Sequence, residues 1–561
     1  MDRRIILALV VLAVVVGLYF FLNKSPIAHS STCGNGVCDA GEKETCSRDC
    51  VASTNTTKPL PITCGDGRCE KGEKTSCPRD CTADVVGQSP NDYEDSPFGI
   101  STSLWADPDA LSDLGIKWTR EGVAWGPPHV GDNAVETVKG RFDFSFPDSL
   151  AVSLSSYGVY PVVNIGTMNP WDQATCHSGC SASAPSDGSK YQCFYIYCNE
   201  EDYKNFVRTT VERYDGDDDY GCTLSAPDCY VAGDRQYPSA EIREAISSDP
   251  WTYWEILNEP FSELWWHAYP YPGGDAIGQY IQILEASNEA VHEACPTCKV
   301  AIGGLYDYTG AHAPPNGMTL ERIRLALDAA GNPFDAMNFH PYGDRTNIET
   351  AIDYFTTNYP TKELIITEMS LLQLTQGDVK KLLDRKRPTE KEESEDLIRR
   401  YVLSINSSVK IIMWFILQES GSDPVFDPGC LLAVDGTKKL QYYTYKLMVE
   451  KLDGSDWDNV QEVYDSGNAH AYKFMKAGQP VWVAWWDYWN EPGVQTKSVT
   501  LQVGSLTSVK TTDSVPHFED GLQLQNSGET YPSFFDTETK SVSSGQVTLN
   551  LGQNPVYVEQ A

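Results

Sequence analysis

Short apolar runs recur along the chain from Pro97 onward, separated by stretches with a helical pattern. We interpret eight of them as strands, because each is four to eight residues long and mostly apolar, as expected for strands buried on both faces. They are Phe98–Thr102, Lys117–Glu121, Tyr160–Ile165, Trp254–Asn258, Val300–Gly304, Ala336–His340, Leu364–Glu368 and Ile411–Phe415. Apolar positions at three- and four-residue spacing predict helices over Ala276–Ala294, Leu320–Ala330 and Thr389–Asn406. Eight strand–helix units in about 350 residues favour an α/β fold of the (β/α)8 TIM-barrel type, and a doubly wound sheet would give the same alternation.

The pattern changes after a helix predicted at Leu440–Leu452. The following runs are short, and Gly, Asn and Asp turns separate them. They are Ala471–Met475, Val481–Trp486, Ser498–Val503, Val547–Leu551 and Pro555–Glu559. About 100 residues of this kind predict a C-terminal β-sandwich. We expect it to be a structural domain packed on the barrel, with carbohydrate binding as the alternative.

The N-terminus contains 18 residues without a charge, Ile5–Leu22, preceded by Arg3 and Arg4. A membrane-spanning helix needs roughly 17–25 such residues, whereas the apolar region of a cleaved signal has about 7–15. We therefore predict a retained transmembrane anchor with the arginines inside and the rest of the chain exported. A cleaved signal peptide, which would make the protein secreted, remains the alternative.

Two copies of one cysteine pattern follow this segment. Their cysteines are Cys33, Cys38, Cys46 and Cys50 in the first copy, and Cys64, Cys69, Cys77 and Cys81 in the second. Each copy has about 20 residues, too few for a hydrophobic core, so we expect two disulfides per copy with a pairing that the spacing does not fix. An exported chain disfavours thiolate metal ligands, and we predict no metal here.

Nine further cysteines lie downstream. Six fall between the third and fourth predicted strands: Cys176, Cys180, Cys193, Cys198, Cys222 and Cys229. In a barrel this interval is a loop at the catalytic face, and we predict a disulfide-pinned flap there, with a merely stabilising insertion as the alternative. Cys295 and Cys298 are close enough in sequence to pair locally, which would leave Cys430 as the odd cysteine.

These boundaries divide the 561 residues into seven parts. They are an anchor or signal (1–30), Cys-rich repeat 1 (31–50), a linker (51–62), repeat 2 (63–81), a second linker (82–95), the barrel (96–453) and the β-sandwich (454–561). The formal charge is −35, from 43 basic and 78 acidic residues. This charge argues against a general nucleic-acid partner, because phosphates would be repelled.

Two carboxylates end apolar strands. Glu259 follows the fourth strand in Trp254-Glu-Ile-Leu-Asn-Glu-Pro260, and Glu368 ends the seventh. A charge at the end of such a run is costly to bury unless it lies at the mouth of the barrel. A single acid of this kind is usually a cap or an ion-pair partner, but two at one mouth indicate catalysis.

With these motifs the sequence resembles the retaining glycoside hydrolases of clan A, especially families 39 and 5, over about residues 97–450. The strand-four motif WEILNEP and the strand-seven motif LIITEMS carry the resemblance. Four further matches support it: Arg120 on strand two, His340 and Tyr342 on strand six, Trp414 on strand eight, and the helix ending at residues 211–216.

The resemblance implies a double displacement, with Glu368 as nucleophile and Glu259 as general acid and then base. Arg120 and Tyr342 would keep Glu368 ionised, whereas burial and the adjacent anion would favour a proton on Glu259. The substrate-binding residues expected around them are Asn258 to the sugar 2-hydroxyl, His340 as a positioning group, Trp414 as the floor of the sugar site, and Trp171 and Trp265 in outer subsites. Arg120 paired only with Glu255 or Glu121, as an interior charge, is the structural alternative.

The predicted function is therefore a membrane-anchored, extracytoplasmic retaining glycosidase that cleaves β-linked oligo- or polysaccharides without a cofactor. A catalytically silent carbohydrate-binding or adhesion protein on a barrel, and a transglycosidase, are the alternatives. Specificity depends on loop residues, so the sugar and its linkage are not readable from the sequence, and the oligomeric state stays open.

Overall fold

The computed structural model describes residues 96–101, 108–126, 134–166, 169–177, 180, 196–217, 239–261, 276–306, 319–342, 346–371, 388–421, 427–487 and 496–561. All of these residues belong to one compact unit that spans Tyr93–Ala561. The predicted anchor at Ile5–Leu22 and both Cys-rich repeats lie outside them. Within the described part of the chain, no helix has both the length and the apolar character that crossing a bilayer requires.

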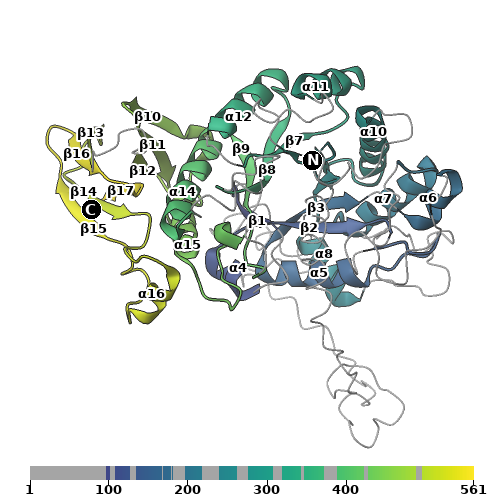
Figure 1. Cartoon of the computed structure of the whole chain (residues 1–561), viewed down its shortest axis with the longest axis horizontal. Helices are drawn as coiled ribbons and strands as arrows, with labels where there is room; N and C mark the ends of the chain where they lie inside the picture. The colour runs from purple at the N-terminus through teal and green to yellow at the C-terminus, as the bar shows by residue number, and fades with distance from the viewer. Residues whose placement is uncertain are drawn as a thin grey trace, which may run out of the picture. The chain divides into compact units, whose positions relative to one another are not determined.

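Eight parallel strands close into a barrel (Figure 1). The strands are β1 (Phe98–Ser101), β2 (Trp118–Ala124), β3 (Tyr160–Gly166), β4 (Tyr253–Ile256), β5 (Lys299–Ile302), β7 (Ala336–His340), β8 (Glu363–Met369) and β9 (Val409–Trp414). Each pairs with its neighbour in this order, β9 pairs with β1, and β5 pairs with β7 through Ala301 and Ala336. A two-residue strand, β6 (Leu305–Tyr306), adds to β7. The closure confirms the predicted barrel over a doubly wound sheet.

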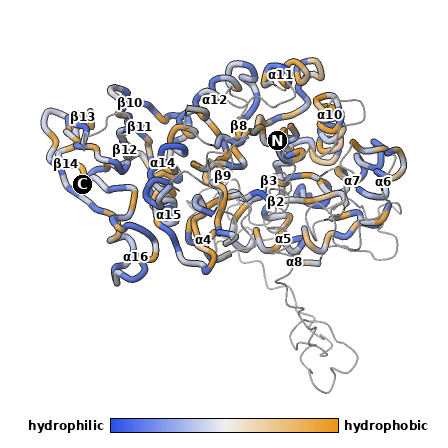
Figure 2. The backbone as a smooth tube through the Cα atoms, in the orientation of Figure 1, coloured by the Kyte–Doolittle hydropathy of each residue, from blue (hydrophilic) through white to orange (hydrophobic). Residues whose placement is uncertain are grey.

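Helices cover the outside of the barrel. They are α4 (Pro108–Leu114), α5 (Ser145–Tyr157), α6 (Pro170–Cys176), α7 (Glu200–Tyr214), α8 (Ala240–Ser248), α10 (Ala276–Ala294), α11 (Leu320–Ala329), α12 (Thr346–Asn358), α14 (Glu390–Asn406) and α15 (Leu440–Leu452). Helix α14 begins where the sequence places a cap, because the Thr389 hydroxyl accepts from the Glu392 amide and the Glu392 carboxylate accepts from the Thr389 amide. Figure 2 shows the hydrophobic positions along the inner strand β9.

The barrel interior is layered, because alternate strand residues point inward. One layer is apolar and contains Trp118, Val162, Tyr253, Ala301, Ala336, Ile365, Ile411 and Met413. Two residues further along β2, β4, β7 and β8, toward their carboxyl ends, the inward positions are polar: Arg120, Glu255, Asn338 and Thr367. The apolar layer thus closes the barrel below, and the polar layer lies at the end where barrel enzymes carry their active sites.

The C-terminal region is an antiparallel six-stranded sheet with a two-stranded sheet against it. The six strands, in spatial order, are β10 (Gln461–Ser466), β11 (Ala469–Lys476), β12 (Gln479–Trp486), β17 (Val556–Gln560), β14 (Ser508–Asp513) and β15 (Thr537–Ser541). The two strands are β13 (Lys497–Gln502) and β16 (Gln546–Leu551). The sequence patterns located five of these eight strands; they missed β10, β14, β15 and the short helix α16 (Gly521–Asn526).

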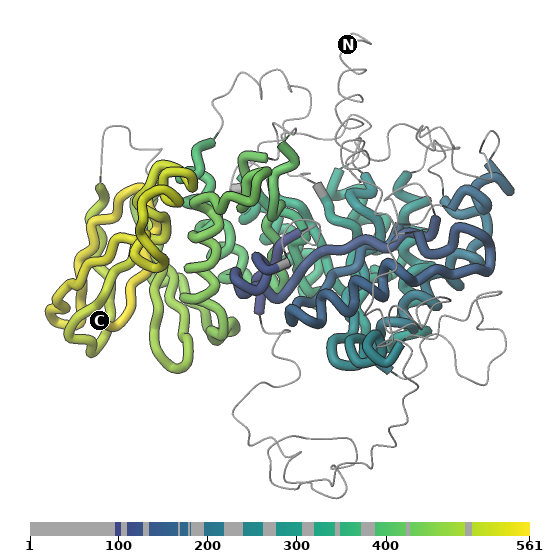
Figure 3. Tube along the Cα trace, turned by 90° about the horizontal axis from the view of Figure 1, so that it is seen from below, coloured from purple at the N-terminus to yellow at the C-terminus, as the bar shows by residue number. Residues whose placement is uncertain are grey.

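Strand β12 shows why this sheet is buried on both sides. Trp482 and Trp486 share a core with β13 and β16, whereas Val483 and Trp485, one residue out of phase, belong to the core of the barrel and its helices. Figure 3 shows the yellow C-terminal strands beside the green helices α14 and α15. A polar contact also links the two parts, since the Arg399 guanidinium of α14 donates to the carbonyl of Gln553 (2.8 Å).

Two disulfides lie within the described residues. Cys176 pairs with Cys198 across the interval predicted to hold a pinned flap, and Cys180 is also disulfide-bonded. Cys295 pairs with Cys298, as predicted. Cys430 is a buried thiol, and burial raises its pKa well above the usual range. Cys193, Cys222 and Cys229 lie outside the described residues.

Candidate active site

The two predicted catalytic carboxylates lie together at the carboxyl end of the barrel. Glu368 is the penultimate residue of β8, and Glu259 lies in the turn that follows β4. A carboxylate oxygen of each, and a ring nitrogen of His340 from the end of β7, all lie within 4.8 Å of one another. Glu259 is 5% exposed and Glu368 is 8% exposed. Both acids are thus nearly buried and close to one another.

Arg120 on β2 is the hub of the site. Its Nη1 donates to Glu368 Oε1 (2.5 Å), and its Nη2 donates to Asn258 Oδ1 (2.7 Å). Its Nε and Nη2 also form a two-point ion pair with Glu255 of β4, at 2.6 and 2.7 Å. Arg120 therefore is an interior charge paired with Glu255, and at the same time the cation beside the predicted nucleophile.

Two residues from the end of β7 complete the surroundings of the acids. The Tyr342 hydroxyl donates to Glu368 Oε2 (2.5 Å). The Nδ1 of His340 lies 3.0 Å from Glu259 Oε1 and 3.7 Å from Glu368 Oε2, and its Nε2 lies 2.9 Å from Thr367 Oγ1. His340 is completely buried and lies between both acids, and its positioning role stays a prediction.

The charges around Glu368 favour its ionised form. Burial alone would raise the pKa of Glu368, but the charges of His340 and Arg120, and the hydrogen bonds from Tyr342 and Arg120, outweigh burial and hold this pKa below its usual range. The pKa of Tyr342 moves in the opposite direction, well above its usual range, first because the phenol is buried and then because Glu368 is negative. Tyr342 therefore remains a hydrogen-bond donor at neutral pH, and Glu368 remains a carboxylate.

The turn that carries Glu259 has an unusual backbone. Leu257 and Glu259 both have positive φ angles, 64° and 43°, a region that residues with a side chain rarely adopt. Gly303, just after β5, lets this turn come close: a Cβ at residue 303 would lie 2.5 Å from the carbonyl oxygen of Leu257 and 2.8 Å from Pro260 Cδ. The glycine and the strained turn together aim Glu259 into the mouth, and strain of this kind is typical of functional sites.

Of the three tryptophans predicted to bind the sugar, Trp414 is buried. Trp414 has 0% of its surface exposed, and its Nε1 donates to the carbonyl of Gly429 (2.7 Å). Its ring presents no face to a sugar here, which differs from the predicted floor of the sugar site. The next residue, Phe415, is half-buried, and its ring stands edge-on to Tyr342 with 6.3 Å between centroids. Phe415 is thus an aromatic residue with accessible surface next to Tyr342.

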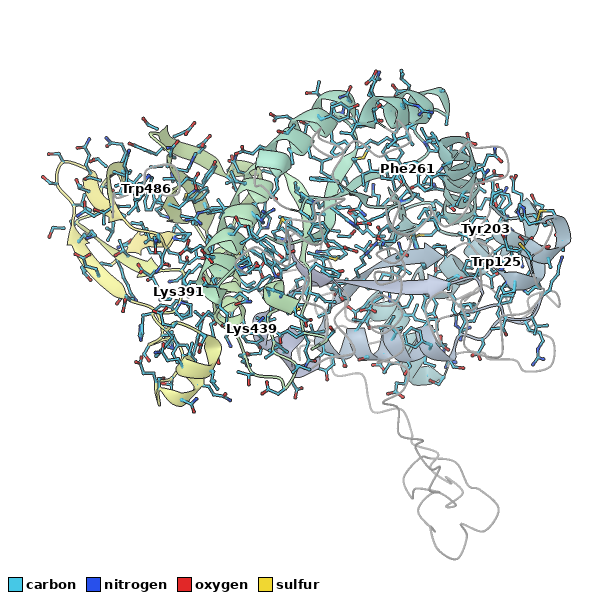
Figure 4. All side chains as sticks on the ribbon, viewed as in Figure 1. Trp125, Tyr203, Phe261, Lys391, Lys439 and Trp486 are labelled. Atoms are coloured by element: carbon cyan, nitrogen blue, oxygen red, sulfur yellow. A yellow bond between two sulfur atoms is a disulfide. The ribbon has the colours of Figure 1, made fainter. Side chains whose placement is uncertain are left out.

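Trp171 is half-buried after β3 and packs edge-on against Trp125, with ring centroids 5.2 Å apart. Figure 4 labels Trp125 next to Tyr203, whose ring stands edge-on to that of Trp125 with 5.6 Å between centroids. Lys139 Nζ lies 5.4 Å from the centre of the Trp171 ring. No contact ties Trp171 to the two acids within the described residues, so its subsite role stays a prediction. Trp265 lies outside the described residues.

The sequence patterns did not assign a site role to Glu255, Asn338 or Thr367. All three are completely buried and point into the polar layer. Asn338 Nδ2 donates to Glu255 Oε1 and to Thr367 Oγ1, both at 2.8 Å. Each is a polar residue in an otherwise apolar strand, at a position that faces the barrel interior as Arg120 does. This pattern could have identified them from the sequence.

Comparisons with known proteins find similar folds but no similar sequences. No sequence profile of a known family matches the chain, and no curated protein sequence matches it. Among solved structures, it is similar to a family 39 glycoside hydrolase from Bacteroides cellulosilyticus WH2, with 16% identity, 84% of this chain and 82% of that chain covered, and a TM-score of 0.54. A glucosidase from Croceicoccus marinus (12%, TM-score 0.52) and a monomeric β-xylosidase from Caulobacter crescentus CB15 (13%, TM-score 0.50) each align over 83% of this chain and 96% of their own. The chain thus has the fold of these glycosidases.

Proposed function

We propose that this protein is a retaining glycoside hydrolase that cleaves β-glycosidic bonds by double displacement. The observation that carries the proposal is the approach of Glu259 and Glu368 to within 4.8 Å at the mouth of the barrel. Inverting glycosidases need roughly 6.5–9.5 Å between their acids to admit a water molecule, so the observed separation favours the covalent route.

Each step assigns a role to groups that are already in place. Glu368 attacks the anomeric carbon, a bond forms between its carboxylate oxygen and that carbon, and the glycosidic bond breaks as Glu259 protonates the leaving oxygen. Water then attacks the same carbon, its proton returns to Glu259, and the bond to Glu368 breaks. Arg120 and Tyr342 stabilise the carboxylate of Glu368 before and after the covalent intermediate. Arg120 also holds Asn258 by its carbonyl oxygen, which leaves the amide nitrogen to donate to a sugar hydroxyl.

We further propose that the enzyme acts outside the cytoplasm. Disulfides at Cys176–Cys198 and Cys295–Cys298 support folding in an oxidising compartment. The membrane anchor rests on the uncharged segment Ile5–Leu22 alone. Fractionation of cells with an antibody to the barrel, before and after an alkaline wash, tests the anchor: an anchored protein stays in the membrane pellet, and a cleaved one appears in the medium.

The catalytic assignment is tested by substitution of each acid in the whole chain, with a panel of aryl β-glycosides. We expect Glu368→Gln and Glu259→Gln each to lower kcat/KM by about 10⁴-fold or more on substrates with a poor leaving group. Azide should partly restore turnover of an activated substrate by Glu368→Ala, with release of a glycosyl azide. Glu363→Gln is the matched control, because Glu363 begins the same strand and its carboxylate accepts from Tyr253 (2.7 Å).

Full activity of Glu368→Gln would overturn the assignment. Binding of glycans without turnover of any substrate by the unaltered protein would favour the silent binding protein. A transglycosidase uses the same acids, and analysis of the products in the presence of an acceptor sugar separates it from a hydrolase.

A further inference from the structure

Glu255 is a third carboxylate beside the two predicted catalytic acids, and it lies behind Arg120. It lies in the middle of β4, completely buried, and two nitrogens of Arg120 bind its two oxygens. The Gly304 amide (3.0 Å) and Asn338 Nδ2 (2.8 Å) also donate to its Oε1. These hydrogen bonds, together with a longer one from Thr367 Oγ1 (3.5 Å), hold the buried carboxylate in position beside Arg120.

Arg120 is consequently shared between two anions, Glu255 and Glu368, which behave differently during the proposed reaction. The Nε edge and one side of Nη2 face Glu255, whereas Nη1 faces Glu368. Under the proposed function Glu368 loses its charge each time it is glycosylated, but Glu255 keeps its charge through the whole cycle. Without Glu255, the guanidinium of Arg120 would bind Glu368 more tightly. The carboxylate of Glu368 would then be a weaker nucleophile toward the anomeric carbon.

We infer that Glu255 is a positioning residue that shares the charge of Arg120 with Glu368 and thereby keeps Glu368 both correctly oriented and reactive. The two-point ion pair turns the guanidinium so that Nη1 meets the nucleophile and Nη2 meets Asn258. The negative charge of Glu255 weakens the hold of Arg120 on Glu368. This role goes beyond the catalytic pair, and its kinetic consequence rests on the proposed function.

The sign of the effect follows from the groups that face Glu368. These are Arg120 from β2, His340 and Tyr342 from β7, and Glu259 from the turn after β4. Removal of the Glu255 charge removes one anion from this cluster and frees Arg120 to bind Glu368. The pKa of Glu368 should therefore fall, and Glu368 should become a weaker nucleophile and a better leaving group.

The first measurement needs no substrate. The chain is labelled with ¹³C at the glutamate carboxyl carbons, and Glu368 is assigned from the signal that disappears in Glu368→Gln. In Glu255→Gln we expect the titration midpoint of Glu368 to move to lower pH by about one unit. An unchanged or raised midpoint would overturn the inference, whether or not the protein is a glycosidase.

The second measurement uses an aryl glycoside that the unaltered protein hydrolyses. Glu255→Gln should lower kcat/KM about 10- to 100-fold and shift the acid limb of its pH profile to lower pH, with no accumulation of the covalent intermediate. A fall in activity without a shift of the acid limb would mean that Glu255 only supports the fold, and would overturn the inference.

Glu121→Gln is the matched control for both measurements. Glu121 is the next residue on β2 and is also buried, but its carboxylate accepts from Thr119 (3.1 Å), and it points to the opposite side of the strand from Arg120. It should change neither the midpoint nor the acid limb. If the proposed function is wrong, Glu368→Gln keeps its activity. That outcome is distinct from the titration result, which remains valid.

Discussion

Two buried acids at the mouth of the barrel, Glu255 and Glu368, differ electrostatically from two buried acids of its outer layers, Glu121 and Glu393. At the mouth, Glu255 and Glu368 each bind Arg120, and the pKa of Glu368 is lowered despite burial. Outside the lumen, burial raises the pKa of Glu121 on β2 and of Glu393 on α14 to about 8 in each case. Neither oxygen of Glu393 has a hydrogen-bond partner in the described part of the chain.

The difference teaches that burial alone does not identify a catalytic acid. Burial favours the neutral form of a carboxyl group, and only a dedicated cation or donor reverses this preference. The mouth supplies Arg120 to its acids, whereas Glu393 receives no hydrogen bond within the described residues and Glu121 receives that of the Thr119 hydroxyl. A site that must hold an ionised nucleophile is therefore recognised by the partners supplied to the acid rather than by its burial.

The largest effect that tests this comparison is expected from Arg120→Met. The substitution leaves Glu255 and Glu368 buried without their cation, and loss of one partner of a buried ion pair costs about 3–5 kcal/mol. Since Arg120 holds the pKa of Glu368 below its usual 4.5, the contribution of this pair should be full at neutral pH and fall away as the pH drops below about 4.5. Thermal unfolding of both proteins at pH 4 and pH 7 measures it.

Arg208→Met is the matched control. Arg208 also forms a close pair with a carboxylate, that of Glu293, but at the surface of α7 and α10 (2.9 Å from its Nε). Exposed pairs contribute about 0–1 kcal/mol, so this variant should change the unfolding temperature little at either pH. Equal effects of the two substitutions would contradict the distinction between the mouth and the surface.

The strands that form the barrel were predictable, because each is a short apolar run with a clear boundary. All eight predicted strands exist, and α10 and α15 have the predicted bounds. The two acids were also predictable, since Glu259 and Glu368 end such runs. Strands β10 and β15 escaped prediction for a physical reason: most of their residues are exposed and polar, so they lack the alternation that one buried face produces.

The polar network behind the acids was harder to predict. Asn338 and Thr367 look like ordinary strand residues until the barrel closes and brings β4, β7 and β8 around one lumen. The burial of Trp414 could likewise not be predicted from the sequence, because an aromatic residue at a strand end can face either the mouth of the barrel or the core. Sequence position specifies which strand carries a residue, but the register between distant strands specifies its partners.

An intermediate effect is expected from Gly304→Ala, which alters the mouth without changing any charge. A Cβ at residue 304 would fall well inside contact distance of the His340 ring, which is completely buried and has no room to retreat. We expect a loss of about 1–3 kcal/mol in stability and about 100-fold in kcat/KM, because His340 bridges both acids. Unfolding and steady-state kinetics measure the two effects.

Gly552→Ala is the control for this glycine, because a Cβ at residue 552 would meet no atom within 4 Å. That variant should retain its activity and its unfolding temperature. Full activity of Gly304→Ala, with unchanged stability, would show that the position of His340 does not matter for the reaction.

The smallest effect is expected in the outer layer, from Glu393→Gln. Glu393 has a folded-state pKa of about 8, raised first by burial and then by Asp396, so the folded protein retains a proton that the unfolded chain loses above about pH 4.5. The stability contribution of Glu393 therefore falls as the pH rises from about 4.5 to about 8, and glutamine has no such dependence. Glu393→Gln should match the unaltered protein near pH 4 and be more stable by about 1–3 kcal/mol near pH 8, in unfolding experiments at pH 4, 6 and 8.

Glu244→Gln, at an exposed position of α8, is the control and should show no such trend. If Glu393→Gln is instead destabilised as the pH rises, the outer-layer acid has a partner of its own, and the contrast with the mouth of the barrel is lost.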